Sequence, residues 1–241
     1  MKTAIITQAR MTSTRLPGKV LKTILDKPLL EYHVERLQRS KLADDVIVAT
    51  TLNSADDLIV KWCEDNRVHY FRGSENDVLS RYYYAAKHYD VDVVARVTSD
   101  CPLIDPAVID KVIFYFLSAV DKYHCVSNTI RRTYPRGMDV SVFSFDVLKE
   151  INLKATSQLN REHVTSFIYE NPQTYLFGNV EWGRDASEHR WTVDTIEDFS
   201  LVRIIIEELY PNKTNFSLLD CLNFIEKNPE LKKINSHIEQ K

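Results

Sequence analysis

Three basic side chains lie close together near the start of the chain, just after a short apolar run. Arg10, Arg15 and Lys19 follow the apolar residues 4–6, and three hydroxyl residues at 12–14 lie between them. A guanidinium can bind phosphate oxygens through two parallel hydrogen bonds, and an ammonium binds them as a point charge. The segment therefore predicts a site for a small anionic ligand such as a triphosphate.

Two aspartates farther along the chain each follow a predicted strand. Asp100 ends the apolar segment 92–100, and Asp194 directly follows HRWTV at 189–193, which its composition predicts to be a strand. In α/β proteins the ligands bind at the carboxyl ends of the strands. Mg²⁺ prefers few carboxylates, with water and phosphate oxygens completing its shell. We therefore expect Asp100 and Asp194 to hold Mg²⁺ beside the basic segment, an arrangement that fits nucleotidyl transfer.

The segments around these residues alternate between strand and helix patterns. The predicted strands are 3–9, 44–51, 68–71 and 92–100, and the predicted helices are 28–40, 54–66, 77–90 and 106–119. This alternation predicts an α/β fold with a mainly parallel sheet covered by helices, and we place an antiparallel portion at about 123–190. A further helix is expected to begin after Thr195, with Asp198 as its capping-box acid. We expect residues 1–241 to form one domain.

Composition excludes several classes of protein. The chain has 241 residues, of which 44% are hydrophobic, and its net charge of −3 argues against a general nucleic-acid binder. We see no signal peptide and no apolar stretch near the roughly 18 residues that span a bilayer. The four cysteines lack metal-site spacing, so we expect reduced structural thiols. These features predict a cytoplasmic protein with neither a nucleic-acid nor a membrane partner.

Four segments carry a resemblance to a known family. QARMTSTRLPGKVL, from Gln8, resembles the opening signature of the CMP-sugar synthetases, above all the CMP-KDO synthetases, which are related to the CMP-acylneuraminate synthetases. RVTSDCPLIDP, around Asp100, resembles their second signature. PRGMDVSVFSFDVL at 135–148 and REHVTSFIYENP at 161–172 resemble the cytidylyltransferase-like family of the spore coat polysaccharide biosynthesis protein F. The resemblance runs from residue 4 to about residue 203.

The resemblance implies a Rossmann-like nucleotidyltransferase fold and a homodimer. It also implies that CTP, with Mg²⁺, activates a sugar acid of the ulosonic or nonulosonic type as its CMP ester. Pyrophosphate would be released, and the product would serve surface polysaccharide synthesis. Carried over to this sequence, the nucleotide-binding residues are Ala9, Arg10, Ser13, Arg15, Lys19, Arg72, Gly73, Asp77 and Ser99. The sugar-binding residues are Arg136, Gly137, Asp139 and His163, the catalytic residues are Arg15, Lys19 and Asp100, and the metal ligands are Asp100 and Asp194.

The segment 132–144 is a candidate for the sugar side of the site. After a bend at Pro135 and Gly137 its residues alternate, so we expect a strand with one face to the core and a polar face to a cleft. Arg136 would bind the acid group of the sugar and Asp139 would accept from its hydroxyls. Alternatively, Arg136 and Asp139 pair with each other at a turn.

Other interpretations stay open. Asp100 could cap a turn, Asp194 could cap the following helix, and His163 could simply pack. A glycosyltransferase of the A-type fold would use an Asp-x-Asp metal motif, which the chain offers at 90–92, before a strand rather than after one. A catalytically silent nucleotide-binding module of a polysaccharide pathway is the third possibility.

Overall fold

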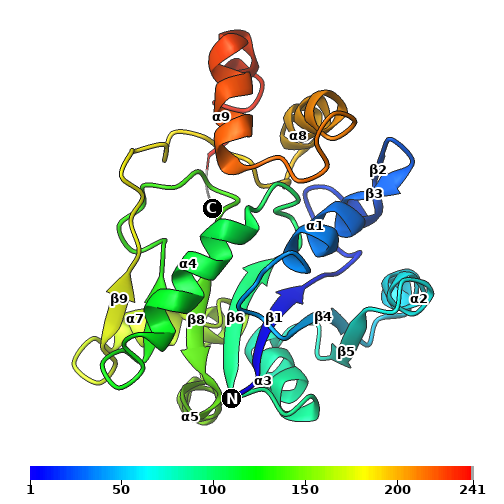
Figure 1. Ribbon diagram of the computed structural model, residues 1–241. Coiled ribbons are helices and arrows are strands. Elements are labelled where there is room, and N and C mark those ends of the chain that lie inside the picture. Colours follow the sequence, from blue (N-terminus) through cyan, green and yellow to red (C-terminus); the bar gives the residue numbers. More distant parts are fainter. Residues whose placement is uncertain (240–241) are drawn as a thin grey trace.

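A seven-stranded sheet runs through the computed structural model, which describes residues 1–239 (Figure 1). The strand order is β5-β4-β1-β6-β8-β7-β9. Strands β5, β4, β1 and β6 are parallel, β8 is antiparallel to both of its neighbours, and β9 is parallel to β7. The bounds are β1 Thr3–Gln8, β4 Asp45–Thr51, β5 His69–Gly73, β6 Val93–Thr98, β7 Cys125–Ser127, β8 Ser141–Ser144 and β9 Phe177–Asn179. The expected mainly parallel α/β fold is confirmed.

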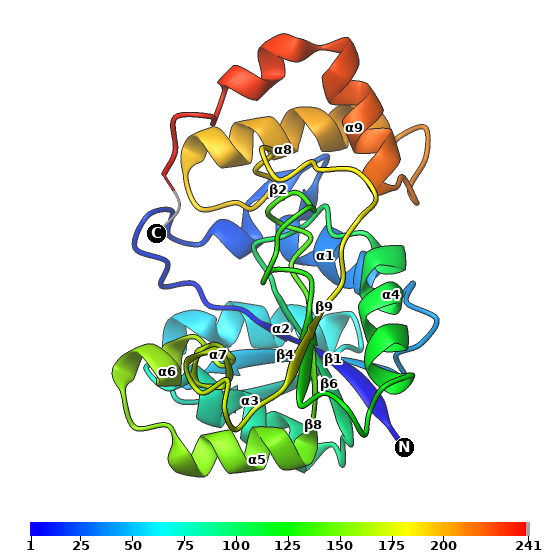
Figure 2. The same ribbon diagram turned by 90° about the vertical axis from the view of Figure 1, so that its left-hand side faces the viewer.

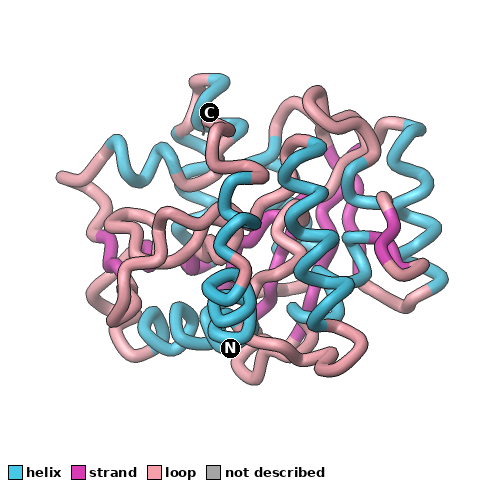
Figure 3. Tube along the Cα trace, turned by 90° about the horizontal axis from the view of Figure 1, so that it is seen from above, coloured by secondary structure: helices cyan, strands magenta, loops and turns pink. Residues whose placement is uncertain are grey.

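Helices cover both faces of the sheet because the buried strands are apolar on both faces (Figures 2 and 3). In β1, Ile5 packs into one core, while Ala4 and Ile6 pack into the other. The first core includes α1 (Leu29–Leu37), α2 (Asp57–Asp65), α4 (Pro106–Leu117), α8 (Ile196–Leu209) and α9 (Leu218–Lys227). The second includes α3 (Val78–His88), α5 (Phe145–Lys154) and α7 (Ser166–Glu170).

Short elements complete the chain. They are the 3₁₀ turns η1 (Lys19–Leu21), η2 (Ser54–Asp56) and η3 (Pro229–Lys233), the two-stranded ribbon of β2 (Thr23–Ile24) and β3 (Lys27–Pro28), and helix α6 (Gln158–Glu162). All four cysteines are buried free thiols, as expected. Among residues 1–239, no helix is long and apolar enough to cross a membrane.

One predicted strand is wrong, and another is shorter than expected and lacks the predicted cleft-facing side. Residues 189–193 form one isolated bridge, between Arg190 and Arg136, because their backbone groups bond to the Asp100 loop and to Arg136 instead of to a ladder. In the segment 132–144, only Ser141–Ser144 is a strand. Its polar residue Ser141 is buried within the sheet and does not face a cleft, because helices cover both sides of β8. The antiparallel direction expected within 123–190 belongs to β8.

Candidate functional site

A cavity of about 520 Å³ opens at the carboxyl ends of β1 and β6. The chain order reverses at this point of the sheet, since β4 and β5 extend from one side of β1 and β6 lies on the other. We call it the first cavity. Nine of the predicted site residues line it: Ala9, Arg10, Ser13, Arg15, Lys19, Ser99, Asp100, His163 and Asp194.

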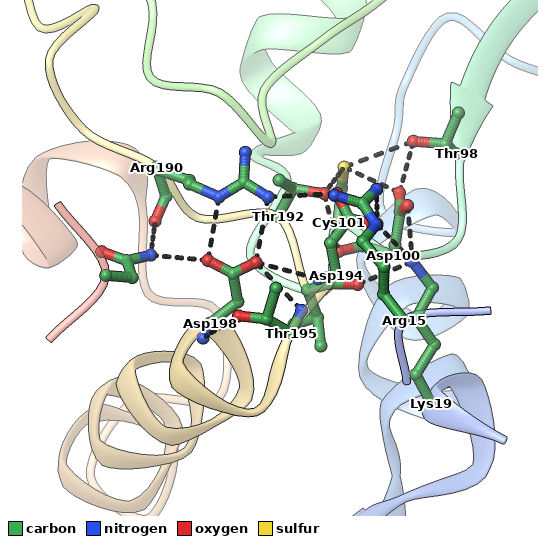
Figure 4. Close-up of polar contacts among 12 residues, drawn as sticks. Arg15, Lys19, Thr98, Asp100, Cys101, Arg190, Thr192, Asp194, Thr195 and Asp198 are labelled. Carbon is green, nitrogen blue, oxygen red and sulfur yellow. Dashed lines mark hydrogen bonds and ion pairs between the residues drawn. The ribbon is translucent and has the colours of Figure 1, made fainter. Parts of the chain in front are cut away.

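The ammonium of Lys19 joins the two predicted metal ligands (Figure 4). Its Nζ donates to Asp100 Oδ2 at 3.0 Å, to Asp194 Oδ1 at 2.8 Å and to the carbonyl of Val193 at 2.7 Å. Lys19 opens η1, directly after Gly18, whose φ of 69° lies in the left-handed region that favours glycine. The Pro-Gly pair of the basic segment therefore helps to aim Lys19 into the cavity.

Burial and charge shift the pKa values of Asp100 and Lys19 in opposite directions. Burial alone would raise the pKa of Asp100, but the Lys19 ammonium and hydrogen bonds from Thr98, Lys19 and Cys101 outweigh it and lower the pKa to about 2. Burial would lower the pKa of Lys19, but Asp100 and Asp194 together raise it. Asp100 and Lys19 are therefore both charged at neutral pH.

Asp194 contacts more cations than Asp100 does. Its Oδ1 also lies 2.9 Å from Arg15, and its Oδ2 lies 3.1 Å from Arg190. Thr195 is the N-cap of α8 and Asp198 completes the capping box, as expected, so Asp194 is not the cap. Asp198 also holds Arg190 through two hydrogen bonds, of 2.9 and 3.0 Å, and accepts from Asn235 Nδ2 at 2.8 Å. The charge network thus extends from the first cavity to the C-terminal segment.

Backbone contacts bring the two carboxylates together although they are far apart in the sequence. The amide of Val193 donates to the carbonyl of Asp100 at 2.7 Å. Trp191 N donates to the carbonyl of Arg136 at 2.8 Å, and a Cβ added at Gly137 would come within 2.8 Å of the Trp191 backbone. Gly137, at φ 101°, therefore permits the close approach that seats the segment carrying Asp194.

Two acidic residues after neighbouring strands fix the basic segment. Asp56, fully buried after β4, accepts from the amide of Met11 at 2.7 Å and from Thr51. Glu75, after β5, accepts from the hydroxyl of Thr12 and lies 3.8 Å from Arg10. These contacts hold the segment across the ends of three parallel strands.

Several predicted residues do not line the first cavity. Arg72 donates to the carbonyls of Thr51 and Asn53 and pairs with Asp57, and Gly73 ends β5. Asp77 caps α3 and pairs with Arg161. Asp139 binds Arg132 through both carboxylate oxygens, so the alternative of an Arg136–Asp139 pair is wrong. Arg136 lines a different cavity.

The sequence interpretation missed other lining residues, among them Gln8, Glu75, Arg81, Gln158 and Glu162. Arg81 is 2% exposed, and within residues 1–239 its Nε and Nη1 have no hydrogen-bond acceptor. Gln8 could have been found, because it ends the first strand. Arg81 gives no such signal, since it lies inside an ordinary helical pattern.

The donors of the first cavity are compatible with Mg²⁺. Among residues 1–239 no group of three or more acidic, histidine or cysteine side chains could hold a metal ion. Asp100 and Asp194 nevertheless converge on one cation, the Lys19 ammonium. Two carboxylates, with water and substrate phosphates as the other ligands, are typical for Mg²⁺.

The sheet and this strand-end site define an α/β protein of the nucleotidyltransferase-like class. The chain belongs to the cytidylyltransferase family, whose model matches residues 4–232. It is 30% identical to the spore coat polysaccharide biosynthesis protein SpsF of Bacillus subtilis, over 93% of this chain and 94% of that protein. A cytidylyltransferase from Leptospira borgpetersenii has a similar structure, with a TM-score of 0.92 and 36% identity over 100% of this chain and 99% of that one.

A more distant structure shares the fold. It is a CMP:2-keto-3-deoxy-manno-octonic acid synthetase complexed with CTP, with a TM-score of 0.66 and 18% identity. The likeness covers 87% of this chain and 100% of that one. The resemblance to the spore coat protein F family and to the CMP-KDO synthetases is thus confirmed at the level of family and fold.

Proposed function

We propose that the chain is a CTP-dependent cytidylyltransferase that transfers CMP to a sugar acid and releases pyrophosphate. The observation that carries the proposal is the convergence of Lys19 and Arg15 on Asp100 and Asp194 in one cavity. Membership of the cytidylyltransferase family supports the reaction, and the CTP in the related synthetase complex supports the nucleotide.

In this proposal Arg10, Arg15 and Lys19 bind the triphosphate. Arg15 and Lys19 now neutralise carboxylates, and both can turn to phosphate oxygens when the nucleotide enters. Asp100 and Asp194 would then be free to hold Mg²⁺, which would offset the negative charge of the phosphates. The protein would act by positioning and charge compensation, and no protein nucleophile is required.

The acceptor sugar is assigned to the side of the first cavity formed by α6. Gln158, Glu162 and His163 line that side. They are far from the basic segment in the sequence but line the same cavity. His163 therefore remains a proposed sugar contact. Arg136 and Asp139 have other surroundings, so we do not assign the sugar to them.

The glycosyltransferase alternative is not favoured by the structure. Asp90 and Asp92 precede β6 and so lie at its amino end, away from the first cavity. Asp92 Oδ2 accepts from the amide of Lys2 at 2.6 Å, which gives it a structural partner.

Pyrophosphate release tests the proposal. The purified chain, with CTP, UTP, ATP or GTP and Mg²⁺, should release pyrophosphate with CTP and one member of a panel of ulosonic and nonulosonic acids. Asp100→Asn and Asp194→Asn should each lower turnover at least a hundredfold, and EDTA should abolish it. Asp92→Asn is the matched control and should leave turnover unchanged. No binding of CTP, or full activity in EDTA, would contradict the proposal.

We also propose the homodimer that the resemblance implies. Phe114 and Tyr115 of α4, and Leu176 just before the edge strand β9, are exposed apolar side chains that a second copy could cover. Light scattering on the purified chain should give twice the mass of 28.0 kDa, and a monomer mass at micromolar concentration would contradict the dimer.

A further inference from the structure

A second cavity, of about 440 Å³, lies between the 188–191 segment and the C-terminal residues that follow α9. Arg136, Arg190, Trp191 and Lys232 line it, and it shares no lining residue with the first cavity. We propose that this second cavity binds a small molecule through a carboxylate or phosphate group. The proposal goes beyond nucleotidyl transfer and does not depend on it.

Arg136 is the first reason. Within residues 1–239 its guanidinium makes no hydrogen bond and no ion pair. The nearest carboxylate in sequence, Asp139, is bound through both oxygens by Arg132. Burial, with the nearby charges of Arg132 and Arg190, lowers the pKa of Arg136. A partly buried guanidinium among other guanidinium groups is stabilised by an anion that neutralises it.

Among the described residues, Trp191 is a second donor without an acceptor in the wall of this cavity. Its side chain is fully buried, and within the described chain its indole Nε1 has no hydrogen-bond acceptor. A buried N–H without an acceptor costs about 1–3 kcal/mol. Trp191 has no accessible surface, so its N–H is an unmet donor buried in the wall of the cavity and not a direct ligand contact. Arg136 and Trp191 are joined by a backbone hydrogen bond of 2.8 Å, so both unmet donors belong to one small region.

The rest of the lining limits the ligand. Lys232 pairs with Glu188 at 2.8 Å, and Arg190 pairs with Asp198, so these cations are already neutralised. One wall of the second cavity is apolar and includes Leu201, Ile225 and Ile238. Room for one anionic group beside an apolar wall fits a small organic anion better than a bare ion or a polyphosphate.

Calorimetry with phenyl phosphate and inorganic phosphate tests the proposal. Because both probes could also enter the first cavity, each is titrated into wild type, Arg15→Gln, Arg136→Gln and the double variant. Phenyl phosphate should bind Arg15→Gln, and adding Arg136→Gln should weaken that binding at least tenfold. Phenyl phosphate should bind more tightly than inorganic phosphate because of the apolar wall.

Three controls keep the result interpretable. Arg131→Gln, at an exposed neighbouring arginine, should bind like wild type, and Arg136→Lys should retain part of the affinity. Trp191→Phe keeps an aromatic ring and removes only an N–H without accessible surface, so it should bind phenyl phosphate like wild type. Melting curves show that each variant is folded. Equal affinity of Arg15→Gln and the folded double variant, or no binding to Arg15→Gln, would overturn the proposal, and neither result depends on whether the chain transfers CMP.

Discussion

The Nζ atom of Lys19 lies 3.0 Å from Asp100 and 2.8 Å from Asp194, so one ammonium bridges the end of β6 and the segment before α8. Both carboxylates line the first cavity, and both contact the same ammonium. Lys19 and a divalent cation would therefore compete for the same oxygens. This competition gives the arrangement measurable consequences.

Replacing Lys19 should separate its structural and ligand-binding effects. Lys19→Met leaves two buried carboxylates without their ammonium, so the free energy of unfolding should fall by about 3 kcal/mol in urea titrations. Mg²⁺ should bind the nucleotide-free variant more tightly than wild type, while pyrophosphate release should fall. Lys41→Met, at an exposed lysine, is the control. Weaker Mg²⁺ binding in a folded Lys19→Met protein would argue against the competition.

Arg15 should contact the outer phosphates of the nucleotide. Arg15→Ala removes one charge-assisted contact, so CTP binding should weaken by about 1.5–3 kcal/mol while CMP binding changes much less. Calorimetry with both nucleotides measures the difference, and Arg203→Ala, at an exposed position of α8, is the control. Equal losses for CTP and CMP would place Arg15 away from the triphosphate tail.

Arg81 should lower the stability of the ligand-free protein and strengthen the binding of CTP. Arg81 is 2% exposed, and within residues 1–239 its Nε and Nη1 lack acceptors, so its burial is costly in the ligand-free protein. Arg81→Met should raise the free energy of unfolding by about 1 kcal/mol and weaken CTP binding about tenfold. Urea titration and calorimetry on the same sample measure both effects. A variant that is less stable and binds CTP normally would show that Arg81 has only a structural role.

His33 should make the protein less stable in mild acid. It is fully buried between Thr7 and the carbonyl of Cys101, and burial lowers its pKa to about 4. The unfolded chain takes up this proton near pH 6.5, so the unfolded state binds more protons between pH 6.5 and 4. The free energy of unfolding should therefore fall as the pH drops through that range, by up to about 3 kcal/mol from this residue.

The comparison of wild type with His33→Gln tests this pH dependence. The variant lacks the titrating ring, so its stability should change less between pH 6.5 and 4. An NMR titration of the wild-type imidazole gives the pKa directly. A His33 ring that titrates near 6.5 in the folded protein would contradict the prediction.

The sequence by itself determined the layered fold and the strand-end groups. Alternating strand and helix patterns are local, because side-chain period follows backbone geometry, and they led to the parallel strands β1, β4, β5 and β6. The chemistry of Arg15, Lys19 and Asp100 could be anticipated because parallel strands present their carboxyl ends at one edge. Asp194 was placed beside them through a predicted strand that does not form. Thr195 and Asp198 were predictable because a capping box spans only a few residues.

The tertiary structure decided which charges meet. Asp139 pairs with Arg132, Asp77 pairs with Arg161, and Arg136 faces a second cavity, although short sequence spacing or family likeness suggested the nucleotide or the sugar for each. The partners of a long charged side chain depend on its rotamer and on segments far away in the sequence, and no local pattern records these. For the same reason, the segment 189–193 looked like a strand, yet its backbone bonds to the Asp100 loop and to Arg136, a contact that exists only after the sheet has formed.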